Sequence, residues 1–171
     1  DLTSYAGAAP LAYLEPNTEA RTSSLQFNAT GVELLLTDGE GRRVGYDQAT
    51  GETLNEIPNS LYYASRLVPP GEEPIGPEER TLFLPEDAGT VYALQVIGLP
   101  TSSLSASSST LDTFEITVVG FDSEFASTQT SISGSLEPDQ VTSFLLHFEP
   151  GESITLKPTT KTYLPLIMRN H

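Results

Sequence analysis

The stretch VYALQVI, residues 91–97, places Tyr92, Leu94 and Val96 on one side of an extended chain and the alternate residues on the other. A period of two is typical of a β-strand with one face against a core and the other towards water. The stretch TFEITVVGF, residues 113–121, alternates in the same way. Both stretches therefore indicate strands of an antiparallel sheet.

Similar short segments recur along the whole chain, and glycines and prolines, 13 of each, lie between them where turns are needed. No segment has the period of an amphipathic helix. The sequence predicts an all-β protein, an antiparallel β-sandwich of Ig-like or jelly-roll type with about ten strands. The further predicted strands are 24–28, 32–37, 44–46, 61–68, 81–84, 128–136, 141–148, 154–157 and 163–168.

The chain divides into an N-terminal arm with a polar hinge, residues 1–23, and a sandwich domain, residues 24–171. A Ser/Thr tract, PTSSLSASSST, occupies residues 100–110. Such a tract is typical either of a linker between two small domains or of a long hairpin loop. We favour a hairpin between 91–97 and 113–121, because each half of the chain alone has few strands for a core. The proline-rich segment 69–80 is predicted to be an exposed loop.

Acidic residues dominate the charge: 23 Asp and Glu face 8 Lys and Arg, which gives a formal net charge of −15. This balance argues against a nucleic-acid partner and against docking on an anionic membrane. There is no cysteine, so thiolate metal sites and disulfides are excluded. No run reaches the length of a membrane-spanning helix. The first residue is Asp1, which predicts a processed chain or an excised domain.

The segment TDGEGRRVGYDQATGETLNEIPNS, residues 37–60, concentrates acids and glycines. Calcium prefers oxygen ligands from such loops, although Arg42 stands where an EF-hand would need a ligand. The alternative is two turns, one at Asp38-Gly39 with positive φ at Gly39, and one from Asp47 that closes at Gly51. The candidate calcium ligands are Asp38, Glu40, Asp47, Asn55 and Glu56.

Three segments resemble β-sandwich modules of exported and cell-surface bacterial proteins: ELLLTDGEGRRVGYDQATGETLNEIPNS, ALQVIG and FEITVVGFDSE. The segment TYLPLIMR, residues 162–169, is similar to a Tyr-Leu-Pro-Leu segment that recurs in exported bacterial proteins. The resemblance implies export, an extracellular or cell-surface location and β architecture. It implies no reaction.

No catalytic residue is predicted. The two histidines are His147, expected on a strand surface, and His171. The motifs of serine hydrolases, zinc proteases and phosphate-binding loops are absent from the sequence. A pair of carboxylates in a cleft would suit a glycoside hydrolase, and this alternative stays open.

Two further sets of residues point to sugars. Tyr46, Tyr62 and Tyr63 are candidates for stacking on sugar rings. Asn28-Ala29-Thr30 has the pattern of an N-glycosylation site, with Asn28 as the acceptor.

The N-terminal arm, DLTSYAGAAPLAYLEPN, contains apolar side chains that water solvates poorly. Adding such an arm as a strand to a neighbour gains main-chain hydrogen bonds and apolar burial together. We therefore expect a non-enzymatic structural subunit of an extracellular filament or surface layer, with copies of itself as partners. The alternative is an accessory carbohydrate- or calcium-binding module of a larger exported protein. The predicted assembly residues are Leu2, Tyr5, Leu11, Tyr13 and Leu14.

Overall fold

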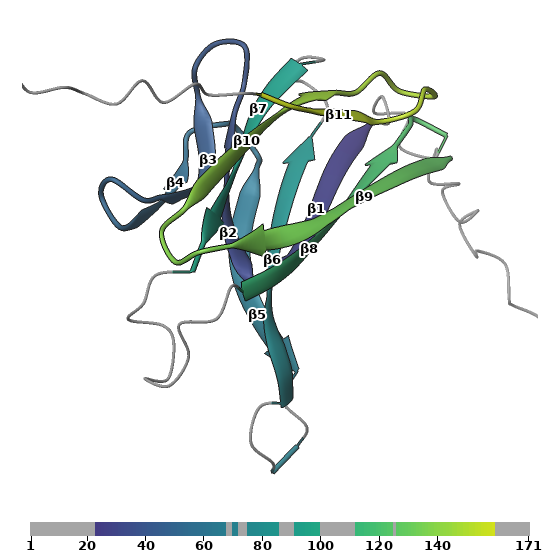
Figure 1. Cartoon of the computed structure of the whole chain (residues 1–171). Helices are drawn as coiled ribbons and strands as arrows, with labels where there is room; N and C mark the ends of the chain where they lie inside the picture. The colour runs from purple at the N-terminus through teal and green to yellow at the C-terminus, as the bar shows by residue number, and fades with distance from the viewer. Residues whose placement is uncertain are drawn as a thin grey trace, which may run out of the picture.

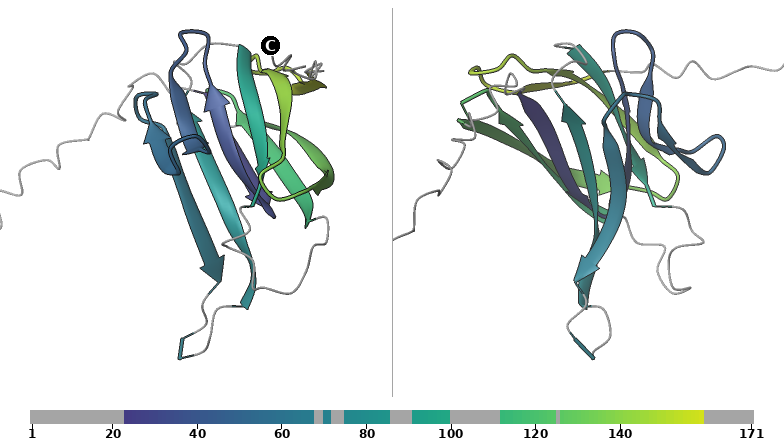
Figure 2. Two further views of the ribbon diagram at one scale, coloured as in Figure 1. Left: turned by 60° about the vertical axis from the view of Figure 1, so that its left-hand side comes forward. Right: turned by 180° about the vertical axis from the view of Figure 1, so that it is seen from behind.

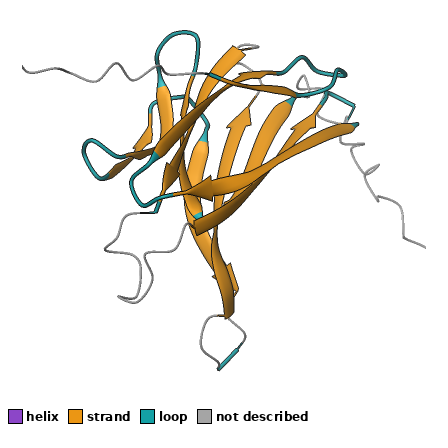
Figure 3. Cartoon of the chain, in the orientation of Figure 1, coloured by secondary structure: helices purple, strands orange, loops and turns teal. Residues whose placement is uncertain are grey.

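The computed structural model describes residues 23–67, 70–71, 75–85, 91–99, 112–124 and 126–159, and this part of the chain is all-β, with eleven strands and no helix (Figures 1 and 3). None of the described segments is a helix long and apolar enough to cross a bilayer. The strands are β1 Ser24–Thr30, β2 Val32–Thr37, β3 Arg43–Asp47, β4 Glu52–Asn55, β5 Leu61–Leu67, β6 Ile75–Pro85, β7 Val91–Gly98, β8 Asp112–Phe121, β9 Ser127–Leu136, β10 Val141–His147 and β11 Thr155–Pro158.

Two antiparallel sheets form the fold, and this confirms the predicted β-sandwich. The five-stranded sheet has the order β5-β6-β1-β8-β9, and the six-stranded sheet has the order β11-β10-β7-β2-β3-β4. Figure 2 shows the two layers from the side and from behind. β5, at one end of the five-stranded sheet, contacts β3 and β4, at one end of the six-stranded sheet. β9 therefore lies at the opposite end of the sandwich, together with β10 and β11.

The core lies between the sheets and is built from the inward set of each alternating strand. In β1 the residues Leu25, Phe27 and Ala29 are buried, whereas the residues between them are partly exposed. Facing strands contribute Leu94 and Val96 from the six-stranded sheet. Burial of these side chains is the main stabilising contribution, at about 1.5–3 kcal/mol for each large one.

The chain passes from one sheet to the other at Gly31, the single residue between β1 and β2. Gly31 has φ of +76°, and a Cβ atom there would lie 2.5 Å from the carbonyl oxygen of Thr113. Only glycine tolerates both the left-handed conformation and the close backbone approach. This position therefore fixes how the first two strands divide between the layers.

The predicted hairpin between 91–97 and 113–121 is wrong. β7 pairs with β2 and β10, and β8 pairs with β1 and β9 in the other sheet. Alternation reveals that a segment is a strand, but it does not reveal its partners. A domain boundary at the Ser/Thr tract is not observed either, because strands from both sides of the tract pair within each sheet.

The segment 69–80 is only partly a loop, since β6 already begins at Ile75 although it contains Pro77. The pairing of β6 with β1 ends at Glu79, so the missing N–H of Pro77 removes no hydrogen bond from that pair. β4 was not expected as a strand. The predicted strand 163–168 lies outside the described residues.

Candidate functional site

Asp38 organises the first turn of the acidic segment. Its side chain is completely buried, and its Oδ1 accepts hydrogen bonds from the backbone N–H groups of Glu40 and Arg42, both at 2.9 Å. Its Oδ2 accepts a hydrogen bond from Arg42 Nε at 2.7 Å. The predicted turn is present, but positive φ occurs at Gly41, at +82°, and not at Gly39.

The other candidate calcium ligands also have protein partners. Arg43 binds Glu56, with Nη2 to Oε1 at 3.1 Å, and its Nη1 lies 3.3 Å from Asp47 Oδ2. Arg42 Nη1 lies 3.2 Å from Glu40 Oε2, and the Oδ1 of Asn55 accepts a hydrogen bond from Ser60 at 2.7 Å. The two arginines thus neutralise the acids that a cation would need.

Within the described ranges, no group of three or more His, Asp or Glu is placed to hold a metal ion. The second predicted turn closes at Gly51, with φ of +73° and a hydrogen bond from its N–H to the Asp47 carbonyl at 2.8 Å. The geometry of this segment supports the turn interpretation over the calcium interpretation.

We expect Asp38→Asn to lower the free energy of unfolding by about 1–2 kcal/mol at pH 7. Burial alone would raise the pKa of Asp38, but the hydrogen bonds from Arg42 and Glu40 outweigh it and hold the pKa below its usual value of 3.8. A lowered pKa in the folded state stabilises the fold above the unfolded pKa, and this contribution is lost as the pH falls through the folded pKa.

Urea unfolding at pH 7 and at pH 3 measures this effect. The difference between wild type and Asp38→Asn should shrink at pH 3, while the exposed control Glu152→Gln should change little at either pH. An equal difference at both pH values would contradict the ion-pair explanation.

The three candidate tyrosines do not form one surface. Tyr62 packs against the core, donates a hydrogen bond from its hydroxyl to Glu33, and accepts one from the N–H of Leu34 at 3.2 Å. Tyr63, the next residue on β5, points to the opposite face and is 50% exposed. Tyr46 lies on β3 in the other sheet. Of the three, Tyr63 offers the most accessible ring.

Asn28 lies on the outward face of β1, the central strand of the five-stranded sheet. Its Oδ1 accepts hydrogen bonds from Gln26 Nε2 at 3.1 Å and from Thr81 Oγ1 at 3.4 Å. Glycosylation of Asn28 stays a prediction. The five assembly residues of the arm, Leu2 to Leu14, lie outside the described residues.

A buried charge cluster joins the two sheets, and sequence reasoning did not find it. Arg80 on β6 binds Glu33 on β2, with Nη2 to Oε1 at 2.6 Å and Nε to Oε2 at 2.9 Å. Each side chain is only 11% exposed. Arg80 Nη1 also lies 2.7 Å from Glu78 Oε2.

Two members of the cluster, Tyr62 and Arg80, have raised pKa values. Burial and the negative charge of Glu33 raise the pKa of Tyr62, so its hydroxyl keeps the proton that it donates. Burial alone would lower the pKa of Arg80, but its bonds to Glu33 and Glu78 outweigh burial and raise it. Tyr62 and Arg80 therefore both stay protonated at physiological pH, which suits a structural link between the sheets.

The free edge of β9 is the candidate assembly site. β9 is ten residues long, STQTSISGSL, and pairs with β8 without a register shift from Ser127 to Leu136. It ends the five-stranded sheet, so no described strand pairs with its other side. The strand contains no charged residue and no proline. Such an edge presents unpaired N–H and C=O groups in a row, a template for another strand.

Apolar side chains lie beside this edge and are only partly covered. Ile132 on β9, Phe144 on β10 and Leu156 on β11 pack against the core as partly buried residues. Phe148 reaches across to the other sheet, where its ring lies over Gly120 of β8. A strand added to β9 would therefore meet both hydrogen-bonding groups and apolar surface.

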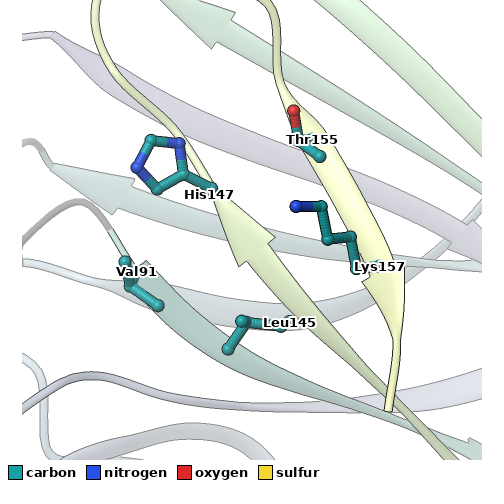
Figure 4. Close-up of a pocket in the computed structure, with 5 residues that line it drawn as sticks. All are labelled: Val91, Leu145, His147, Thr155 and Lys157. Atoms are coloured by element: carbon teal, nitrogen blue, oxygen red, sulfur yellow. The ribbon is translucent and has the colours of Figure 1, made fainter.

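A shallow hollow of about 280 Å³ lies on the outward face of the six-stranded sheet (Figure 4). Its lining is formed by Val91 of β7, Leu145 and His147 of β10, and Thr155 and Lys157 of β11. His147 lies at the surface as expected, 3.5 Å from Glu149. The lining side chains include no carboxylate and so no pair of acids for glycoside hydrolysis.

Comparisons with known proteins give no match to any family model, curated protein or solved structure. The resemblance to exported bacterial modules therefore stays a prediction.

Proposed function

We propose that this chain is a non-enzymatic structural subunit of an extracellular filament or surface layer, and that copies join by β-strand addition. The observation that supports this proposal is the long, uncharged edge of β9. The N-terminal arm of one copy is the donor, and β9 of the next copy is the acceptor. The extracellular location follows from the resemblance to exported modules.

The other sheet edges differ from β9 because each has a feature that hinders pairing. β4 has only four residues and includes Glu52. β5 has a register shift between Ser65 and Leu67 and contains Arg66 there. β11 has four residues and ends in Lys157 and Pro158. Among the described edges, β9 is the one without such protection.

The composition of the arm fits this acceptor. Either Leu11 and Tyr13 or Ala12 and Leu14 would point inward, depending on the register, and would cover the partly buried residues beside β9. The absence of charge on β9 matters because the chain as a whole repels itself, with a net charge of −15. A contact between different surfaces of successive copies does not close on itself unless its rotation forms a ring, so it favours an open filament.

Deletion of residues 1–14 should abolish assembly and leave a folded monomer, because every described strand begins at Ser24 or later. Light scattering coupled to size exclusion measures the mass, and circular dichroism checks the fold. A synthetic peptide of residues 1–14 should bind the truncated chain, whereas a scrambled peptide should not. Polymers formed by the truncated chain would refute the donor-arm mechanism.

The alternative is an accessory binding module of a larger exported protein. Its calcium form gains no support from the arginine-paired acids of residues 37–60. One observation favours its carbohydrate form: the outward face of the five-stranded sheet has a broad region without charge.

A further inference from the structure

The outward face of the five-stranded sheet has a broad region without charge, which we call the neutral face. Cross-strand register places its residues in three rows that run across the strands. None of the rows contains Asp, Glu, Lys or Arg, although the chain has a net charge of −15. The rows are Leu61, Phe83, Gln26, Val119 and Gln129; Tyr63, Thr81, Asn28, Thr117 and Ser131; and Pro85, Ser24, Phe121 and Ser127.

The centre of the neutral face consists of amide and hydroxyl side chains. Gln26 and Thr81 both donate hydrogen bonds to the Oδ1 of Asn28, which orients its amide. Asn28 Nδ2 and Gln26 Oε1 make no hydrogen bond with the described residues, so a donor and an acceptor stand side by side at the centre of the sheet. Such pairs match the hydroxyl groups of a sugar, which donate and accept.

One end of the neutral face is apolar and exposed. Leu61 is 55% exposed and Tyr63 is 50% exposed, both on β5, and Phe83 of β6 lies opposite Leu61. An exposed aromatic ring offers an apolar, electron-rich face with a polar tip, which suits the C–H face of a sugar ring. Five strands at a spacing of about 4.8 Å give the rows a length of about 20 Å, long enough for several sugar rings.

We propose that the neutral face binds an uncharged polysaccharide chain, with Tyr63 as the stacking residue and Gln26 and Asn28 as hydrogen-bonding residues. An anionic polymer would meet a negatively charged protein with no compensating cation on this face. A cationic polymer would find no carboxylate in the three rows, since the nearest ones on this face, Glu79 and Glu115, lie in the next row, beside Thr30. A neutral, hydroxyl-rich ligand is the class that the face matches. This binding does not require assembly through β9.

Isothermal titration of the full chain with cellohexaose, xylohexaose and mannohexaose tests this proposal, with hexagalacturonate as the charged comparison. Intact mass is measured first, and a sugar on Asn28 would contradict the proposal, because it would cover the centre of the face. At least one neutral hexasaccharide should bind, and hexagalacturonate should bind at least about tenfold more weakly. Tyr63→Ala should weaken binding about tenfold. The matched control Tyr46→Ala, on the other sheet, should bind like wild type.

Several results would overturn the proposal. The proposal fails if no neutral hexasaccharide binds, or if hexagalacturonate binds as tightly as the neutral hexasaccharides. It also fails if Tyr63→Ala binds like wild type, or if Tyr46→Ala loses as much affinity as Tyr63→Ala. A partner protein or a second copy on this face would give the first of these results. Circular dichroism of Tyr63→Ala separates a lost contact from a lost fold.

Discussion

Glu33→Gln should lower the free energy of unfolding by about 3 kcal/mol, because it leaves Arg80 buried with only part of its charge compensated. Glu33 accepts hydrogen bonds both from the guanidinium of Arg80 and from the hydroxyl of Tyr62, between the two sheets. A neutral amide cannot balance the cation. Glu78 still lies beside Arg80 and limits the loss. Urea unfolding at pH 7 measures the change.

Two comparisons make this prediction specific. Glu56→Gln breaks an arginine pair that is exposed to solvent, and its effect should be close to the error of the measurement. The double variant Glu33→Leu with Arg80→Met removes both charges and should recover part of the stability, while the Tyr62 hydroxyl loses its acceptor. Equal effects of Glu33→Gln and Glu56→Gln would contradict the idea that the buried cluster stabilises the fold more than an exposed ion pair does.

The sandwich could be predicted from the sequence because burial on one sheet face leaves a period of two in each strand. The stretch VYALQVI gave the strand that forms β7, and the polar segment 128–136 gave β9. The sequence pattern does not indicate which strands pair with each other, which is why the expected hairpin between 91–97 and 113–121 is wrong. In the sequence, Glu33 only interrupts an apolar run. Its partner Arg80 lies 47 residues away, so no local pattern indicates the ion pair.

For the candidate sites, too, the sequence indicates the residues but not their arrangement in space. Acids were found at 37–60, but whether they bind a cation or an arginine depends on geometry, and Arg42 and Arg43 lie within bonding distance of four of them. The sequence identifies the three tyrosines as candidates, but the sheet and the sheet face on which each of them lies depend on strand pairing and register. The neutral face is formed by strands distant in sequence, so no local pattern reveals it.

Placing lysines on the β9 edge should block assembly. Ser131→Lys with Ser133→Lys adds two long charged side chains at exposed positions of this strand. Lysine is a common protection of natural edge strands, because pairing would bury or crowd its charge. The concentration needed for assembly should rise at least about tenfold, which corresponds to about 1.4 kcal/mol per contact.

The matched control carries the same two charges on interior strands and none on β9 itself. Ala93→Lys on β7 and Thr113→Lys on β8 are exposed positions of interior strands. This variant should assemble like wild type in a sedimentation assay. If both double variants assemble equally well, β9 is not the acceptor.

Cross-linking between the arm and β9 tests strand addition most directly. The chain has no cysteine, so Ser131→Cys combined with Ala12→Cys or with Tyr13→Cys introduces one defined pair for each register of the arm. A short bismaleimide is added to each assembled variant, and denaturing gels separate the products. Strand addition predicts a ladder of covalently linked chains in one of the two variants. A closed single chain in both, with the arm linked to its own β9, would contradict it.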